Sequence, residues 1–185
     1  MPAMARRRHD RHFRSEADPR IRGDVELASG ARTCFPRAMK KRSPDKTPPV
    51  SPPDYGRSLR GLGFNLLVSD VARSVAFAVE VLGATSFYDD EDFAAMKLHG
   101  GDFMFHADHS YRGNPLSGIV ARVEARGAGV ELRVYGCDPD QAEAQARAGG
   151  WTVLAGSIDK PHGLRECIIV DDDGYAWIPG MAIKG

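Results

Sequence analysis

Alternating apolar and polar positions mark two short strands, each followed by a helical stretch. In residues 62–68 every even-numbered position is apolar, and in residues 130–134 Val130, Leu132 and Val134 alternate with charged residues. Side chains of a strand point to opposite faces in turn, so this pattern predicts strands with one buried face. The same order of elements therefore occurs twice in the chain.

The helix that follows each strand is bounded by residues with capping chemistry. Apolar positions within residues 71–82 recur at three- and four-residue spacing, which predicts an amphipathic helix. Asp70, or the serine before it, can accept a hydrogen bond from the first turn, and Gly83 ends the helix. The second helix is predicted to begin at Asp138-Pro139 and to end at Gly149-Gly150.

Shorter extended segments follow both helices. After the first helix they cover residues 85–88, 93–98 and 103–106, with a hairpin turn at Gly100-Gly101; after the second they cover 151–154, 164–170 and 175–178. The polar residues 107–128 suit a connection between the two copies. The sequence therefore predicts an α+β fold of two tandem βαβββ units that form a curved mixed sheet around a concave pocket.

The beginning of the chain differs from the rest in composition. Residues 1–58 hold 14 Lys and Arg, 7 Asp and Glu and eight of the 12 prolines, whereas residues 59–185 hold 11 basic and 18 acidic residues. Such a segment buries too little apolar surface to offset the entropy of ordering. We predict a disordered, basic, Pro-rich extension over 1–58, with an irregular linker from Pro48 to Gly56, and a domain over 59–182.

The arginines of the extension leave a second interpretation open. Arg6, Arg7 and Arg8 resemble a patch for nucleic acid or a membrane surface. Neither interleaved aromatic residues nor an amphipathic stripe accompanies them, so we expect no membrane partner and no nucleic-acid partner. A solvated extension, or a start codon assigned too early, is the simpler interpretation.

The cysteines and the hydropathy pattern bear on the compartment. Cys34, Cys137 and Cys167 are far apart and contain no CxxC pair, which favours reduced thiols without a zinc or redox role. No apolar segment is long enough for a signal peptide core or a membrane span. We therefore expect a cytoplasmic protein.

Several of these residues also form motifs. The pattern Leu66-x-Val68-Ser69-Asp70-x5-Ala76-Phe77-x4-Leu82-Gly83-Ala84 and the later Asp172-x-Gly174-Tyr175 resemble the glyoxalase, bleomycin resistance and dioxygenase superfamily, also called vicinal oxygen chelate proteins. The resemblance covers about residues 60–180. It implies the paired βαβββ fold, but this superfamily includes isomerases, lyases, oxygenases and antibiotic-binding proteins, so the reaction stays open.

The resemblance also implies where a metal would bind, and this chain departs from it there. Metal-dependent members carry a histidine or glutamate in each opening strand and a carboxylate in the closing strand. The matching positions here are Gly63, Gly129 and Ile178. Glycine supplies no side-chain donor and isoleucine disfavours a cation, so we expect no metal and no other cofactor.

Other polar residues are candidates for ligand binding. His106, Asp108 and His109 lie at the end of a predicted strand, and alternation places His106 and Asp108 on one face, where they suit ligand contact, metal binding or a structural role. Asn65 faces the concave pocket of the first unit. We include Asn65 and His106 in the predicted ligand site.

The second unit supplies the remaining candidates. Glu131 and Arg133 share the polar face of its opening strand, where they could replace the missing ligands with a charge pair. His162 lies in a turn that the resemblance places at the pocket mouth. The resemblance implies that Arg165 binds a ligand anion, although a structural ion pair suits it equally.

These observations favour binding of a small organic molecule without a metal, with antibiotic sequestration as one function of this kind, and the resemblance implies a homodimer. The rival hypothesis is a lyase, isomerase or dioxygenase whose metal site is displaced to His106, His109 and Glu166. Catalytic residues stay unassigned.

Overall fold

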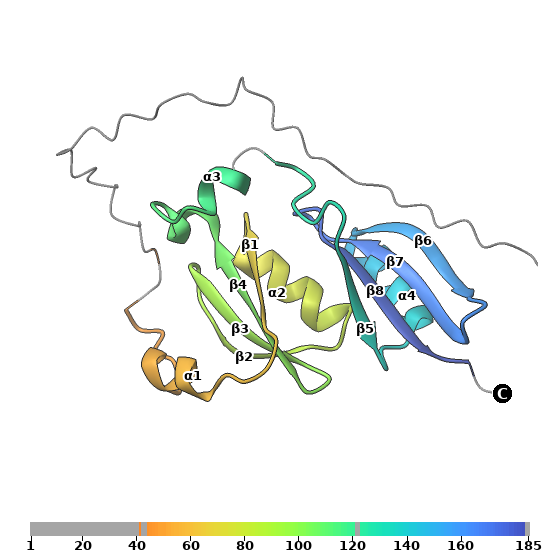
Figure 1. The fold of residues 1–185 in the computed structure, drawn as a ribbon, viewed down its shortest axis with the longest axis horizontal. Coiled ribbons are helices and arrows are strands. Elements are labelled where there is room, and N and C mark those ends of the chain that lie inside the picture. The colour runs from red at the N-terminus through yellow and green to blue at the C-terminus, as the bar shows by residue number, and fades with distance from the viewer. Residues whose placement is uncertain (1–40, 42–43, 121–122, 184–185) are drawn as a thin grey trace, which may run out of the picture. The chain divides into compact units, whose positions relative to one another are not determined.

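Two four-stranded sheets lie side by side in the computed structural model, which describes residues 41, 44–120 and 123–183 (Figure 1). The first unit consists of β1 (Phe64–Val68), α2 (Val71–Glu80), β2 (Thr85–Asp89), β3 (Phe93–Leu98) and β4 (Gly101–Ala107). The second consists of β5 (Glu131–Tyr135), α4 (Pro139–Gly149), β6 (Thr152–Asp159), β7 (Leu164–Val170) and β8 (Ala176–Ala182). The predicted α+β fold of two βαβββ units is confirmed.

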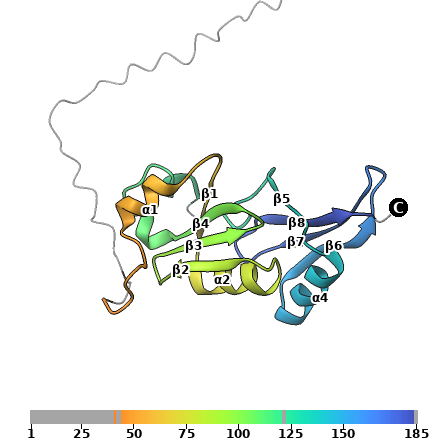
Figure 2. The same ribbon diagram turned by 90° about the horizontal axis from the view of Figure 1, so that it is seen from below.

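Both sheets have the same topology. The strand orders are β1-β4-β3-β2 and β5-β8-β7-β6. The opening strand of each unit pairs in parallel with its closing strand, and the other pairs are antiparallel. Figure 2 shows α2 and α4 on the same side of the strands, so each sheet has one face covered by a helix and one face without it.

The predicted helix starts are confirmed by their hydrogen bonds. The Asp70 side chain accepts the backbone N–H of Arg73 at 3.1 Å. Asp138 accepts N–H groups from the first turn of α4, where proline occupies the first position. These contacts satisfy donors that have no partner within the helix, which is why the sequence signals were reliable.

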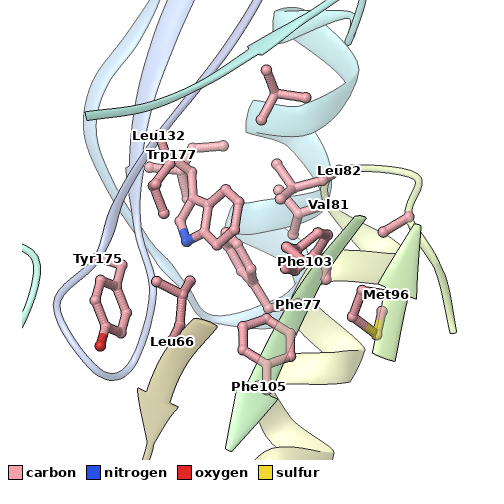
Figure 3. Packing of buried hydrophobic residues seen from close by; sticks show 14 of the residues in the cluster. Leu66, Phe77, Val81, Leu82, Met96, Phe103, Phe105, Leu132, Tyr175 and Trp177 are labelled. Atoms are coloured by element: carbon pink, nitrogen blue, oxygen red, sulfur yellow. The ribbon is translucent and has the colours of Figure 1, made fainter. Parts of the chain in front are cut away.

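One hydrophobic core joins the two units (Figure 3). Phe77 of α2 packs edge-on against Trp151 with ring centroids 5.4 Å apart, and it also contacts Trp177. Phe103 of β4 lies 5.8 Å from Trp177. Because these aromatic contacts cross from one copy to the other, neither unit buries its apolar face alone.

Buried ionic contacts also cross between the units. Both carboxylate oxygens of Asp173 accept the N–H of Ser69, each at 3.0 Å. Arg126, from the connection, lies 3.3 Å from Asp173 and forms two hydrogen bonds with Asp108. It also donates to the carbonyl of Leu67. The acidic turn before β8 is therefore an anchor for the first unit.

The segment before the first strand corrects the sequence analysis. Pro52–Ser58 form a short helix, α1, within the range that was predicted to lack regular structure. Ser51 caps it by accepting the N–H of Asp54, and the prolines occupy its first turn, where their missing N–H groups cost nothing. The prediction of disorder for residues 1–40, including the arginine patch, lies outside the described residues.

The connection between the units also contains short helices. A 3₁₀ helix, η2, spans Asp108–Tyr111, and α3 spans Ser117–Val120. Because η2 begins directly after β4, strand alternation ends there. Asp108 consequently does not follow His106 onto the same face, as the sequence pattern had predicted.

Cys137 and Cys167 are buried free thiols, as expected, and burial raises the pKa of each to about 11. Cys34 lies outside the described residues. Within the described ranges, no helix is both long and apolar enough to cross a membrane.

Candidate functional site

A cavity of about 320 Å³ lies against the face of the first sheet that α2 leaves uncovered. We call it the ring cavity because six rings line it: Tyr55, Phe87, Tyr88, Phe93, His106 and Tyr111. Phe93 of β3 and His106 of β4 are register partners, so their side chains share this face, with centroids 4.7 Å apart. The cavity is concave and mostly apolar, as small-molecule sites usually are.

A β-bulge places two consecutive aromatic residues on the ring cavity. The register between β2 and β3 shifts between Ser86 and Tyr88. Regular alternation would turn Phe87 and Tyr88 to opposite faces, whereas the extra residue of a bulge re-aims a side chain. Both rings therefore line the same cavity.

The opposite wall of the ring cavity comes from the segment before the first strand. Pro48, Val50 and Pro52 line it, and the Tyr55 ring of α1 stacks on Phe87 with centroids 6.0 Å apart. We call residues 44–58 the strap. Figure 2 shows α1 on the side of the first sheet opposite α2. The segment predicted as a linker is therefore part of a cavity wall.

Asn65 and His106 both belong to this region. The Asn65 side-chain amide donates to the Tyr111 hydroxyl at 2.5 Å, and the Tyr111 ring lies 4.9 Å from His106. Burial lowers the pKa of His106, so the imidazole is neutral at pH 7. The other two residues of the predicted cluster separate: Asp108 pairs with Arg126, and His109 shares a 2.7 Å hydrogen bond with Asp92.

Two buried carboxylates lie at one end of the ring cavity. Asp90 accepts hydrogen bonds from the Tyr88 hydroxyl and from the backbone N–H groups of Asp92 and Phe93. Asp92 accepts the backbone N–H of Lys41 in addition to its bond with His109. The cavity thus combines aromatic faces with acidic groups.

The uncovered face of the second sheet carries a different arrangement. Arg133 lies between two carboxylates: it forms a 2.9 Å ion pair with Glu131 and a second ion pair with Glu166 of β7. It also donates to the Tyr135 hydroxyl at 3.1 Å. His162 lies 3.3 Å from Glu166. We call Glu131, Arg133, Glu166 and His162 the ion-pair cluster.

The ion-pair cluster keeps Glu166 charged. Burial alone would raise the pKa of Glu166, but hydrogen bonds from His162 and Arg133 outweigh it and lower the pKa. The hydrogen bond with Tyr135, together with those to the two glutamates, raises the pKa of Arg133 against the effect of burial. Glu166 and Arg133 therefore offer fixed charges for orienting a ligand.

A second cavity, of about 310 Å³, lies where the two units meet. Leu62 and Phe64 line it on the side of the first unit, and Glu131 and Arg133 line it on the side of the second. The groove that the internal repeat leads one to expect is therefore present, and two of the predicted residues line it.

Arg165 lies apart from the other candidates. Its guanidinium forms two 2.7 Å hydrogen bonds with Asp140 of α4 and one of 2.8 Å with Asp159. Because neighbours on a strand face opposite ways, Glu166 points to the uncovered face and Arg165 to the helix. Its contacts are those of the structural alternative considered for it.

The residues at the superfamily's metal positions do not fit a metal ion. Gly63 and Gly129 have no donor side chain, and Ile178 is buried beside Arg133, its register partner on β5, whose positive charge repels a cation. In the part of the chain that the structure describes, no three His, Cys, Asp or Glu side chains gather in a metal-binding arrangement. The displaced set of the rival hypothesis is also divided, since Glu166 belongs to the ion-pair cluster and His109 to Asp92.

Sequence reasoning missed most of the ring cavity. Tyr55 was assigned to an irregular segment, and Phe87 and Tyr88 were placed in a strand without any role. A signal was present in the strap, where a serine followed by two prolines and an aspartate has the chemistry of a helix start. The bulge left no comparable signal.

Solved structures of known proteins share this fold. A glyoxalase/bleomycin resistance protein/dioxygenase from Nocardioides matches with 21% identity and a TM-score of 0.52, covering 71% of this chain and 91% of its own. A glyoxalase-related enzyme from Fulvimarina pelagi matches with 17% identity and a TM-score of 0.53, covering 66% and 88%. A family enzyme from Burkholderia phytofirmans PsJN matches with 16% identity and a TM-score of 0.55, covering 65% and 97%.

At these identities the likeness establishes the fold, and the activities of those proteins stay with them. No protein-family model matches the sequence, and no curated protein matches it.

Proposed function

We propose that this chain, which has the fold of the glyoxalase, bleomycin resistance and dioxygenase superfamily, binds a small organic molecule in the ring cavity without a metal ion. The observation that carries the proposal is the cavity itself: six rings line about 320 Å³ on the face of the first sheet that α2 leaves uncovered. Burial of a flat ligand against such rings supplies most of the binding free energy, and a few polar groups fix its orientation.

The groups around the cavity suffice for binding alone. His106 is neutral at pH 7, and Glu166 of the ion-pair cluster holds its charge. Sequestration needs only affinity, so a protein that removes an antibiotic or another organic molecule from solution could work with this set of groups. Asn65 orients Tyr111 at the cavity, and Glu131, Arg133 and His162 line or adjoin the neighbouring groove.

The test is a thermal-shift screen of small molecules, antibiotics included, on the full chain. A ligand that binds only the native state stabilises it, by about 2.7 kcal/mol when the ligand concentration is a hundred times Kd. The melting temperature therefore rises. Val50→Trp, which fills the cavity from the strap, should abolish the shift. Val79→Trp on α2 is the matched control, since the two valines are 37% and 42% exposed.

A shift that survives Val50→Trp unchanged would place the ligand elsewhere, and a library without any hit would refute the binding function. The absence of metal is tested separately by elemental analysis of protein purified without chelator. We expect metal far below one ion per chain, and a stoichiometric content would favour the enzyme hypothesis.

We also propose a homodimer. Tyr135 of β5 and Leu154 and Ile158 of β6 are exposed large apolar residues of the second sheet. A second copy that covers them would remove this surface from water. Analytical ultracentrifugation should show a dimer, and Ile158→Lys should shift it toward monomer. A wild-type protein that sediments as a monomer at high concentration would refute the assembly.

A further inference from the structure

The aromatic rings that line the ring cavity contact one another in a continuous series. The centroid of the Tyr55 ring lies 6.0 Å from that of Phe87 and 6.4 Å from that of Phe93, and the Phe93 and His106 centroids are 4.7 Å apart. His106 in turn lies 4.9 Å from Tyr111. Aromatic faces carry partial negative charge and attract cations that come within about 6 Å of the ring centre.

The charged groups that line the ring cavity are acidic. Asp90 and Asp92 line it, and no lysine or arginine of the described residues does. The lysines nearby have carboxylates of their own: Lys46 pairs with Asp89, and Lys97 pairs with Asp102. Asp92 already has His109 as a partner, so Asp90 is the carboxylate of the two that could attract a cation.

Asp90 is the strongest single indication. It is 6% exposed, and its hydrogen bonds come from a tyrosine hydroxyl and two backbone N–H groups, all of them neutral. In the described part of the chain no lysine, arginine or histidine forms an ion pair with it. A buried carboxylate without a counter-charge is costly, and an external cation would relieve that cost.

We infer that the ring cavity binds an organic cation, an ammonium group substituted with methyl or other alkyl groups and carried on a flat apolar body. The inference rests on the proposed small-molecule function and names its ligand class. The ammonium group lies against the rings and near Asp90, while the apolar body fills the space toward the strap. A quaternary ammonium needs no hydrogen-bond acceptor, which suits a cavity whose carboxylates already accept bonds from the protein.

The test compares three probes of similar size by isothermal titration calorimetry on the full chain. (4-Hydroxyphenyl)trimethylammonium and 4-tert-butylphenol differ only in a charged nitrogen in place of a carbon, and 4-hydroxybenzoate supplies a negative charge. We expect the cation to bind at least about tenfold more tightly than the neutral probe, and the anion to bind most weakly. Equal or tighter binding of 4-tert-butylphenol would overturn the inference while leaving small-molecule binding intact.

Variants locate the effect. Asp90→Asn keeps an acceptor for the backbone N–H groups and removes the charge. It should therefore weaken binding of the cationic probe about tenfold and leave the affinity for 4-tert-butylphenol unchanged. Glu91→Gln is the matched control, because Glu91 is the exposed next residue of the same turn and does not line the cavity. An equal loss of affinity for the cationic probe in Asp90→Asn and Glu91→Gln would show that the affinity depends on long-range charge and not on contact with Asp90.

Tyr55→Leu removes one ring from an exposed helix and does not depend on the stability of the turn at Asp90. This substitution should weaken binding of the cationic probe more than binding of the neutral probe. An unchanged ratio of the two affinities would refute the role of the rings. If neither probe binds the wild-type protein, the inference fails at this cavity. The library screen with Val50→Trp then decides the broader proposal independently.

Discussion

Replacing Arg126 by leucine should destabilise the fold by leaving a buried acid without its counter-charge. Asp173 is 5% exposed, and the Arg126 guanidinium lies 3.3 Å from it. Removal of one partner from a buried ion pair typically costs about 3–5 kcal/mol. We expect a loss at the low end, about 3 kcal/mol of unfolding free energy. The reason is that Asp173 keeps its hydrogen bonds from the Ser69 N–H, and the Leu67 carbonyl keeps its hydrogen bond from the Tyr175 hydroxyl.

A double-mutant cycle separates the ion pair from lost packing. In Arg126→Leu/Asp173→Asn the charge is removed together with its partner, and the asparagine oxygen can still accept from Ser69. The double variant should therefore recover about 2 kcal/mol relative to Arg126→Leu. Urea denaturation at pH 7 measures each free energy of unfolding, and an unchanged m value would show that the unfolded state is comparable.

The pH dependence supplies a second check. Burial raises the pKa of Asp173 above its ordinary value of 3.8, although Ser69 and Arg126 oppose this. The native state therefore binds the proton at a higher pH than the unfolded chain, so protonation on acidification adds stability. Without Arg126 the pKa of Asp173 should rise further, and Arg126→Leu should cost less at about pH 4.5 than at pH 7.

Two results would refute this reasoning. A cost below about 1 kcal/mol for Arg126→Leu would show that Asp173 does not need the guanidinium. A cost of equal size at both pH values, unrelieved by Asp173→Asn, would assign the whole loss to packing.

Two further predictions concern backbone strain and thiol reactivity. Gly174→Ala should lower the free energy of unfolding in urea by about 3 kcal/mol, since φ is +82° and a Cβ would approach the Ala125 Cα to 2.5 Å. Gly163→Ala, at φ +85° with open space around it, should cost about 1–2 kcal/mol. Equal costs would contradict the close approach at Gly174. Cys137 and Cys167, whose pKa values are raised to about 11, should not react with Ellman's reagent at pH 8 until urea unfolds the protein, and fast labelling of both in the native state would contradict their burial.

Local chemistry explains which elements the sequence could predict. Asp70 and Asp138 cap helices through hydrogen bonds to residues two or three positions away, so the signal and its partner lie in one short window. The repetition of such windows predicted the paired units. The resemblance implied the paired βαβββ fold, which the two four-stranded sheets confirm, whereas the order of strands within each sheet was not predicted.

The candidate site depends on contacts that no short window contains. Tyr55 meets Phe87 across a sheet face, and a one-residue bulge determines that Phe87 faces it. Asp108 leaves the strand one residue earlier than alternation requires, because η2 begins there. Glu131 and Arg133 form the ion pair that alternation suggested, since both lie on one regular strand.

The strap has a consequence for how this fold could acquire new selectivity. Pro48, Val50 and Tyr55 line the ring cavity, yet none of them contributes a rung to either sheet. Changes at these positions would remodel the recognition surface while the duplicated scaffold keeps its hydrogen bonds. A library randomised only there would sample new ligand preferences at little risk to folding, as loop-borne specificity does in other scaffolds.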